Sequence, residues 1–464
     1  MAKQSTLFPN DDVRRTTDQF LVKLLQDSTP LGVDESVSPA EDLSAFRRAL
    51  SAVDFSTPQD LHHLLQWTVE HLQHGLVQMT HPRYFGLFNP APSYPAECAD
   101  RIAAAFNPQI CVWSHAPVAV DIERHVIEQV AQRAGLPEGS GGHFTCGGSE
   151  ANHTAVSCAL TAAHDDFAEK GVFAFAGQPR IYASAESHLA WVKIAHQTGI
   201  GRKAVRLIDT DGSGRMCAAA LARVIETDRA GGSVPVLIAS TAGTTNAGMV
   251  DPLHACADIA KEYGLWHHVD AAWGGALIAS ERYRTCLDGI ARADSVTIDA
   301  HKWFATTMGT GMFLTPHRHV LQTTFRVATS YMPSNDQAVD YYVNSMQWSR
   351  RFIGLRLFLA LANAGWQGFA DHVERGIRLM ERLTTQLDAA GWQIANASSM
   401  AVACLIPPPG GESVEECVAR IVASGQAWVS VTQFESQPVV RICITNGRTS
   451  SADIDALIRL LRNQ

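Results

Sequence analysis

The chain has 464 residues, of which 46% are hydrophobic and 8% aromatic, so it can bury a large core that we expect to divide between two or three domains. Its formal net charge of -9 comes from dispersed carboxylates, and the absence of a basic run with interleaved aromatic residues argues against nucleic acid or an anionic membrane as a partner. The N-terminus is polar and no segment offers about 18 consecutive apolar residues, so we expect a cytoplasmic protein without a membrane span.

Ten cysteines are scattered along the chain, and no two of them form a Cys-x-x-Cys pair. Zinc sites and disulfide frameworks usually show regular cysteine spacing. We therefore predict reduced, mostly buried thiols and no metal ion at the functional site.

The first part of the chain has the apolar spacing of amphipathic helices. Between residues 41 and 78, apolar side chains recur every three or four positions, as at Leu61, Leu65, Val69 and Leu72. This pattern predicts an N-terminal helical arm that spans residues 1–78.

After this arm, short apolar runs alternate with longer amphipathic segments. The runs that read as buried strands are 180–184, 204–208, 234–240, 264–269, 295–298 and 312–314. Helical patterns between several of them imply crossover connections. We expect an α/β domain over residues 79–352 with a mainly parallel central sheet.

From Arg350 onwards, a long helical pattern leads into a smaller unit. Strand-like runs at 400–406 and 439–444 precede a helical pattern near 451–461. The sequence therefore predicts a small C-terminal α/β domain over residues 353–464.

Residues whose side chains could take part in binding or catalysis follow several of the predicted strands. They are the turn Gly147-Gly148-Ser149, His188, Thr244, Asp270 and Lys302. In open α/β sheets, ligands bind at the carboxyl ends of the strands, where residues distant in sequence converge. One site could collect all of these residues.

A lysine, an aspartate and a glycine-rich turn together suggest pyridoxal 5'-phosphate (PLP). The amine of Lys302 could form a Schiff base with the aldehyde of this cofactor. The carboxylate of Asp270 could keep the pyridine nitrogen protonated, so that the ring accepts electrons when a bond at Cα breaks. Taken singly, Lys302 could be a surface lysine and Asp270 could simply cap a turn.

The remaining candidates could complete a cofactor site. Backbone N–H groups at Gly148 and the hydroxyl of Ser149 begin an alanine-rich helix and could bind a phosphate. The imidazole of His188 could stack on the ring, although a lone histidine is often structural. Thr244 could bind a cofactor substituent or be a satisfied turn hydroxyl. Asp299 and His301 flank Lys302 and could support the phosphate or the Schiff base.

The order of these motifs resembles that of a known family. The chain contains Gly-Gly-Ser-Glu-Ala-Asn at 147–152, then His188, then His-Val-Asp-Ala-Ala-Trp at 268–273, then Asp-Ala-His-Lys-Trp at 299–303. From about His81 to the C-terminus it resembles the PLP-dependent group II amino-acid decarboxylases of fold type I, which include aromatic-amino-acid, glutamate and diaminobutyrate decarboxylases. This resemblance implies release of carbon dioxide from an L-amino acid to give an amine.

The resemblance also implies roles for individual residues. It makes Lys302 the Schiff-base lysine, Asp270 the pyridinium partner, His188 the stacking imidazole, and Gly148 and Ser149 the phosphate ligands. Thr244 and Asp299 match further cofactor contacts. Family members often have Asn at the position of Asp299, where a carboxylate would repel the phosphate unless it points elsewhere.

The segment 326–344 resembles the family's mobile catalytic loop. Tyr331 falls at the position of a tyrosine that returns a proton to the substrate carbon after carbon dioxide leaves; without the family, a surface aromatic would be the preferred interpretation. The resemblance implies that this loop reaches into the site of a partner subunit, so that a homodimer is required for activity.

The substrate is less well defined than the reaction. Tyr84, Phe85, Phe88 and Pro90 could form an apolar wall that suits an aromatic or other bulky amino acid, and they could equally be core or interface residues. The nearby Arg83 could instead admit an acidic substrate. Glutamate, aspartate and diaminobutyrate therefore remain alternatives.

Two other functions fit parts of the pattern. One is a different fold type I reaction, such as transamination or sulfur removal from cysteine, but desulfurases commonly have Gln where Trp273 stands. The other is a PLP-binding subunit without turnover, against which the intact set of Lys302, Asp270, His188 and Tyr331 argues.

Overall fold

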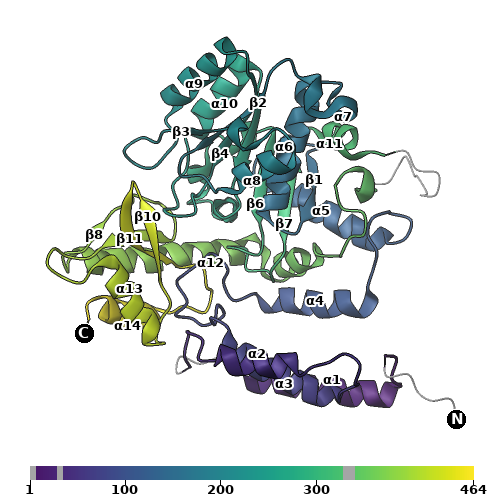
Figure 1. Ribbon diagram of the computed structural model, residues 1–464, viewed down its shortest axis with the longest axis vertical. Helices are drawn as coiled ribbons and strands as arrows, with labels where there is room; N and C mark the ends of the chain where they lie inside the picture. The colour runs from purple at the N-terminus through teal and green to yellow at the C-terminus, as the bar shows by residue number, and fades with distance from the viewer. Residues whose placement is uncertain (1–6, 29–34, 328–339, 464) are drawn as a thin grey trace.

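The computed structural model describes residues 7–28, 35–327 and 340–463, and a seven-stranded sheet lies at its centre (Figure 1). The strand order is β1-β7-β6-β5-β4-β2-β3. Of the described strands in this sheet, only β7 runs antiparallel to its neighbours, which confirms the predicted mainly parallel α/β fold. The strands are β1 (Gly141–Thr145), β2 (Pro179–Ser184), β3 (Val205–Ile208), β4 (Val234–Thr241), β5 (Trp266–Asp270), β6 (Ser295–Asp299) and β7 (Gly311–Thr315).

Helices cover both faces of this sheet because its inner strands are apolar on both sides. In β4, Leu237 and Ala239 pack with α6 and α8, whereas Ile238 packs with α9 and α10. The helices of this region are α5 (Pro117–Arg133), α6 (Gly148–Ala163), α7 (Phe167–Lys170), α8 (Ala190–Gln197), α9 (Ala218–Ala230), α10 (Leu253–Tyr263) and α11 (Arg318–Phe325). Short 3₁₀ turns are η1 (Gly171–Ala174), η2 (Arg202–Ala204), η3 (Gly274–Ala279), η4 (Arg284–Leu287), η5 (Ile290–Arg292) and η6 (Tyr341–Val343).

The N-terminal helices lie along one side of the molecule, below α4 in Figure 1. They are α1 (Asp11–Ser28), α2 (Leu43–Ser51) and α3 (Leu61–Gly75), followed by α4 (Tyr94–Phe106). Asp42 caps α2 and Asp60 caps α3 by accepting backbone N–H bonds, which explains where these two helices begin. None of the described residues in α1, α2 or α3 is fully buried.

The C-terminal part consists of one long helix, a small sheet and two short helices. The long helix is α12 (Leu355–Asp388), which is interrupted at Gly365, where φ is 64°. The antiparallel sheet has the order β10-β11-β9-β8. Its strands are β8 (Gln393–Ile394), β9 (Val402–Ile406), β10 (Ser430–Phe434) and β11 (Gln437–Cys443), and its helices are α13 (Val414–Ala423) and α14 (Ser451–Leu461).

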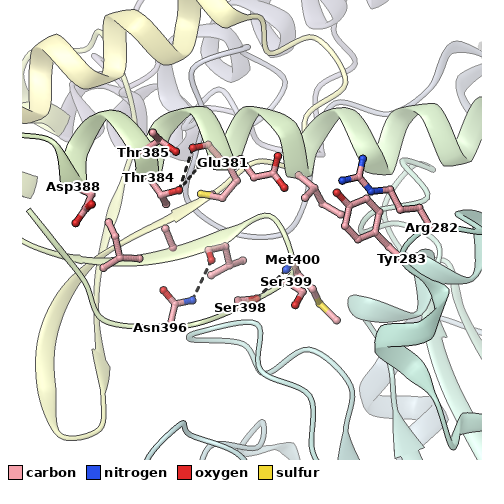
Figure 2. A pocket seen from close by; sticks show the side chains of 15 residues that line it. Arg282, Tyr283, Glu381, Thr384, Thr385, Asp388, Asn396, Ser398, Ser399 and Met400 are labelled. Carbon is pink, nitrogen blue, oxygen red and sulfur yellow. Dashed lines mark hydrogen bonds between the residues drawn. The ribbon is translucent and has the colours of Figure 1, made fainter.

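A cavity of about 530 Å³ lies between α12 and the strands beneath it (Figure 2). Two of its polar side chains form hydrogen bonds with nearby backbone groups. Asn396 donates to Val402 O at 3.1 Å, and Ser398 Oγ accepts from Met400 N at 3.1 Å. The Lys302 motif does not line this cavity.

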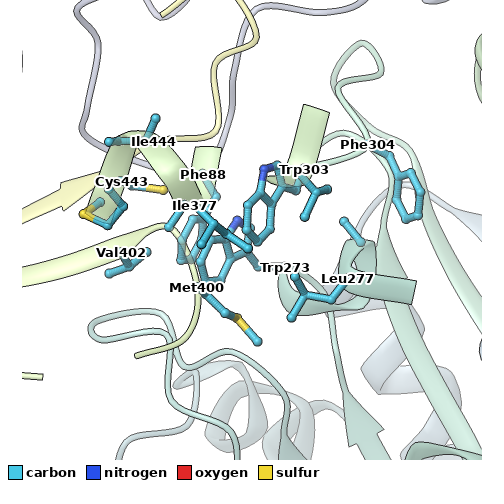
Figure 3. Close-up of a cluster of buried hydrophobic side chains, with 14 of the residues drawn as sticks. Phe88, Trp273, Leu277, Trp303, Phe304, Ile377, Met400, Val402, Cys443 and Ile444 are labelled. Atoms are coloured by element: carbon cyan, nitrogen blue, oxygen red, sulfur yellow. The ribbon is translucent and has the colours of Figure 1, made fainter. Parts of the chain in front are cut away.

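The largest buried cluster joins the central sheet to the C-terminal part. Phe88, Trp273 and Trp303 pack there with side chains from α12, β9 and the segment after β11 (Figure 3). Because one core spans both parts, α12 and the small sheet are fixed against the strands that carry the candidate site. The division of the chain at residues 78 and 352 stays a prediction.

Across the ranges that the structure describes, no helix is both long and apolar enough to span a membrane.

Candidate functional site

The carboxyl ends of the central strands bring the predicted motifs to one edge of the sheet. Thr145 at the end of β1 and Asp299 at the end of β6 both pair with Gly311 of β7. Asp270 at the end of β5 pairs with Thr241 and with Thr297. The turn after β1, the end of β5 and the turn after β6 therefore meet.

A cavity of about 310 Å³ lies at this edge. Most of the residues that the sequence predicted for the site line it: Phe88, Gly148, Ser149, His188, Asp270, Asp299, His301 and Lys302. The wall also includes Cys146, Glu150, Asn152, Thr241, Thr245 and Trp273.

Lys302 lies one turn beyond β6. Its backbone N–H donates to Asp299 O at 3.2 Å, and its Nζ lies 3.1 Å from Asp299 Oδ2. The Lys302 side chain is 22% exposed, so the amine can be reached from the cavity, whereas that of Asp299 is 3% exposed. Asp299 therefore points at the lysine ammonium in this structure, and within the described chain its Oδ1 has no hydrogen-bond partner.

Asp270 is held by two donors. Asn152 Nδ2 donates to Asp270 Oδ2 at 2.8 Å, and the backbone N–H of Ala272 donates to Oδ1 at 3.1 Å. The carboxylate is buried but borders the cavity, so its remaining lone pairs can accept a hydrogen bond from a ligand there.

The glycine turn forms the start of α6. Gly147 has φ of 157°, a conformation that favours glycine, and Glu150 accepts the backbone N–H of Cys146 at 2.7 Å. A Cβ placed on Gly148 would lie 2.9 Å from Asp299 Oδ2, so only glycine fits there without a shift. The free N–H groups of the first helical turn can thus face the cavity.

The thiol of Cys146 also borders the cavity but is not a competing nucleophile. Burial and the hydrogen bond with Glu150 raise the pKa of this thiol to about 11. It is therefore protonated at neutral pH and a poor nucleophile.

The two histidines of the cavity wall differ in solvent exposure. His188 is exposed, and its Nδ1 accepts the backbone N–H of Ala190 at 3.1 Å. His301 is buried, and its Nδ1 lies 3.1 Å from Thr310 O and 3.2 Å from Thr310 N. The first can turn over a ligand, whereas the second is fixed by the loop before β7.

Thr244 is placed differently from the expectation that it contacts the cofactor. It is fully buried and does not line the cavity, because its hydroxyl accepts the backbone N–H of Met249 at 3.0 Å within the turn after β4. The alternative interpretation, a satisfied turn hydroxyl, describes this contact. Thr241 and Thr245 line the cavity instead.

Of the four residues predicted to form the substrate wall, only Phe88 lines the cavity. Its ring stacks on Trp273 with centroids 4.3 Å apart and an interplanar angle of 15°. Tyr84, Phe85 and Pro90 are buried away from it, which fits the alternative interpretation of core residues.

Arg83 does not supply a free cation to the site, because its Nε binds Asp453 at 3.0 Å. Arg441 of β11, which was not among the predicted site residues, contacts two residues of the cavity wall. Its guanidinium carbon is 4.6 Å from the centroid of the Phe88 ring, and its Nε donates to Thr245 O at 2.9 Å. Arg441 is 3% exposed, and no described residue accepts a hydrogen bond from its Nη2.

Arg441 could not be located from local pattern alone. It lies in a run of apolar residues far along the chain from the other site residues, and its one sequence signal is a charge inside a buried strand. Tyr331, the predicted proton donor, lies outside the described residues.

The described residues fit PLP. The site offers an accessible amine, a carboxylate with free acceptor capacity, and a helix start without a Cβ at its first position. These groups match the aldehyde, the ring nitrogen and the phosphate of the cofactor. The carboxylate of Asp299, which lies against Gly148, does not suit a phosphate at this helix start.

Residues 47–404 match the family model described as "Pyridoxal-dependent decarboxylase conserved domain". An aromatic-L-amino-acid decarboxylase from Bacillus atrophaeus is 29% identical over 413 residues, which cover 86% of this chain and 84% of that protein. The acidic amino acid decarboxylase GADL1 from Bos taurus is 30% identical over 406 residues, 83% of this chain and 77% of that protein. The crystal structure of mouse CSAD in apo form superimposes with a TM-score of 0.91 and 26% identity, covering 98% of this chain and 99% of that one.

Proposed function

Because the chain belongs to the pyridoxal-dependent decarboxylase family and is a PLP-dependent amino-acid carboxy-lyase, we propose that its substrate is an L-amino acid with an aromatic or other bulky side chain. The observation that carries this proposal is the stacked Phe88–Trp273 pair, which places two apolar rings in the wall of the cavity beside Lys302. The similarity to an aromatic-L-amino-acid decarboxylase supports the same choice.

We propose the following roles for the residues around the cavity. Lys302 binds the cofactor aldehyde, Asp270 accepts a hydrogen bond from the ring nitrogen, and the start of α6 at Gly148 and Ser149 binds the phosphate. PLP, when bound, supplies the electron sink for the bond that breaks at Cα. His188 covers the exposed side of the cavity and can stack on the ring.

Tyr331 is proposed to donate the proton that replaces carbon dioxide on the substrate carbon. This role rests on the family resemblance. The presence of Tyr331 together with His188 favours an amine as the product, since related aldehyde synthases replace one or the other.

A second candidate substrate is an acidic amino acid, and Arg441 is the observation that favours it. The unpartnered Nη2 belongs to a buried guanidinium whose neighbours Phe88 and Thr245 both line the cavity. A carboxylate that reached this nitrogen would gain a charge-assisted hydrogen bond. GADL1, which is 30% identical, is named for acidic substrates.

A screen for released carbon dioxide separates the two candidates. The holoenzyme is offered the proteinogenic L-amino acids together with dihydroxyphenylalanine, diaminobutyrate and ornithine. We expect kcat/KM to be highest for an aromatic amino acid. Highest turnover with glutamate or aspartate, and loss of that preference in Arg441→Gln, would favour the acidic candidate.

We also propose that the enzyme is a homodimer. Large apolar side chains on α2 and α3 are about half exposed in the single chain, among them Leu43 (52%), Leu61 (52%) and Leu72 (49%). A second copy of the chain would cover this surface. Sedimentation should give twice the mass of one chain, and a monomer with full activity would contradict the proposal.

A further inference from the structure

Asp270 is one end of a chain of buried hydrogen bonds that runs from the cavity into the sheet. Asn152 Nδ2 donates to Asp270 at 2.8 Å, and Asn152 Oδ1 lies 3.0 Å from His268 Nε2. His268 Nδ1 lies 2.7 Å from Ser295 Oγ, which accepts the indole N–H of Trp266 at 2.8 Å. These residues come from α6, β5 and β6, and Asn152, His268 and Ser295 are at most 2% exposed.

The Asp270 end of this chain fixes the direction of its hydrogen bonds. At the other end, the Trp266 indole can only donate, and Ser295 Oγ, which accepts this bond, keeps its own hydrogen available for His268 Nδ1. An ionised Asp270 can only accept, so Asn152 must present its amide N–H to Asp270 and its oxygen to His268. The oxygen of Asn152 needs a donor at His268 Nε2, so a neutral His268 carries its proton on Nε2 and its Nδ1 accepts from Ser295.

The surroundings of His268 favour the neutral ring that this arrangement needs. Burial lowers the pKa of His268 to about 3. Thr297, on the neighbouring strand, donates a second hydrogen bond to Asn152 Oδ1 at 2.8 Å, which holds the amide in the same orientation. The edge of Trp191 packs against the ring with centroids 5.7 Å apart, and this contact excludes water.

We propose that Asn152, His268 and Ser295 are positioning residues that keep the Asp270 carboxylate aimed into the cofactor cavity as a hydrogen-bond acceptor. The inference rests on the proposed contact between Asp270 and the cofactor ring nitrogen. Asn152 occupies one carboxylate oxygen and fixes the rotation of the carboxylate. The remaining lone pairs of Asp270 would then be directed to accept a hydrogen bond from the ring nitrogen of the cofactor.

The tautomer of His268 tests the arrangement without reference to activity. In full-length protein labelled with ¹⁵N-histidine, with and without PLP, the His268 signals are assigned by their loss in His268→Phe. We expect a protonated Nε2 and an unprotonated Nδ1 in both samples. A proton on Nδ1, or on both nitrogens, at neutral pH would overturn the inference.

The neighbouring His267 provides a matched control for the link to the cofactor. It lies in the same strand, is equally buried, and bonds to the hydroxyl of Ser240 at 2.9 Å, but it is not part of the chain that ends at Asp270. We expect His268→Phe to raise the PLP dissociation constant on the order of tenfold and to move the ¹⁵N signal of labelled PLP towards an unprotonated ring nitrogen. His267→Phe should leave both unchanged, and His268→Gln, which can still donate to Asn152, should restore them in part.

Asp270→Asn separates failure of this inference from failure of the proposed site. If Asp270→Asn shifts the ring nitrogen signal but His268→Phe behaves like His267→Phe, the cofactor contact holds and the positioning chain is wrong. If Asp270→Asn leaves the signal unchanged, the contact itself is wrong and the inference falls with it.

Discussion

At the scale of single residues, Asp299 is a carboxylate beside the helix start that is proposed to bind phosphate. In space, its carboxylate packs against two glycines. A Cβ added to Gly148 would lie 2.9 Å from Oδ2, and a Cβ added to Gly311 would lie 2.7 Å from Oδ1. The carboxylate pairs with the Lys302 ammonium in this structure. If Lys302 binds the cofactor aldehyde as proposed, its nitrogen would no longer be a free ammonium, whereas Asp299 would stay as a buried carboxylate beside the helix start that is proposed to bind phosphate.

Replacing this carboxylate with an amide should therefore strengthen cofactor binding. We expect Asp299→Asn to lower the PLP dissociation constant about fivefold, the equivalent of ~1 kcal/mol of relieved like-charge repulsion. Fluorescence titration of the apoenzyme with PLP measures it. Asp294→Asn, at the other end of β6, is the control and should leave binding unchanged; weaker binding by Asp299→Asn would show that the Asp299–Lys302 pair assists assembly of the site.

The predicted polar site residues that line the cavity share a simple signal, a polar group shortly after a buried strand. Lys302 and Asp270 carry this signal, and both line the cavity. Thr244 carries it too, but a tight turn directs its side chain to Met249, and no periodic pattern reveals such a turn. Arg441 carries no local signal, because a distant strand brings it to the site.

At the scale of elements, a buried ion pair joins the segment before α12 to the central sheet. Arg350 binds Glu123 of α5 at 2.6 Å and donates to Phe144 O of β1 at 2.8 Å, and both charged side chains are 0% exposed. Glu123 also accepts the backbone N–H of Gly354, the N-cap residue of α12, at 2.8 Å. The pair thus fixes the start of α12 at Leu355. The helical pattern in the sequence predicts a start at Arg350, five residues earlier.

Breaking this pair should destabilise the whole chain. Arg350→Met leaves Glu123 buried without its counter-charge, and we expect the free energy of unfolding in urea to fall by about 3–5 kcal/mol. The double variant Arg350→Met with Glu123→Leu should lose less, because no charge stays buried alone. Arg15→Met, which removes an exposed pair with Asp12, should change stability by less than about 1 kcal/mol. A double variant as unstable as the single one would contradict this account.

The predicted strands and helices correspond closely to those observed where apolar periodicity is strong. All six predicted strands of the large sheet are present, and the closing helix spans Ser451–Leu461 as expected. The sequence reasoning missed β1, since its residues Gly141-Gly-His-Phe-Thr145 lack a continuous apolar run. Tertiary packing against β7 and α5 makes this segment a strand in spite of its glycines.

At the scale of the whole molecule, buried histidines make the fold sensitive to acid. Burial lowers the pKa of His143 and His268 to about 3 and that of His267 to about 4, from an ordinary value of 6.5. Between these values and pH 6.5 the unfolded chain binds protons that the folded chain does not, so stability falls as pH decreases through this window. Asp251, whose pKa burial raises to about 6, offsets part of this loss.

His143 allows the effect to be tested at one residue, since neither of its ring nitrogens has a hydrogen-bond partner among the described residues. We expect His143→Leu to stabilise the protein by about 1–2 kcal/mol at pH 7, because an unsatisfied polar ring is removed. It should also reduce the pH dependence of stability by roughly 1 kcal/mol per pH unit between pH 4 and 6. Urea titrations at several pH values measure both, and an unchanged slope would show that His143 is not neutral in the folded state.

The family, the PLP cofactor and the carboxy-lyase activity that the motifs predicted are confirmed by the match over residues 47–404 and by the decarboxylase relatives. The motifs sufficed for this because cofactor chemistry depends on a few groups at strand ends. The side chains that we propose to select the substrate, such as Phe88, Trp273 and Arg441, are brought together by packing, so their arrangement could not be predicted from motifs alone.

The central claim is that Lys302 supports PLP-dependent decarboxylation of an L-amino acid, and one comparison tests it most directly. Purified holoenzyme and Lys302→Ala, both supplied with PLP, are incubated with an aromatic L-amino acid while carbon dioxide, amine and visible absorbance are followed. We predict equal amounts of carbon dioxide and amine from the native enzyme, and loss of both products and of the lysine-bound chromophore in the variant. A variant that keeps the covalent chromophore, or a PLP-loaded native enzyme that releases no carbon dioxide from any L-amino acid, would contradict the account.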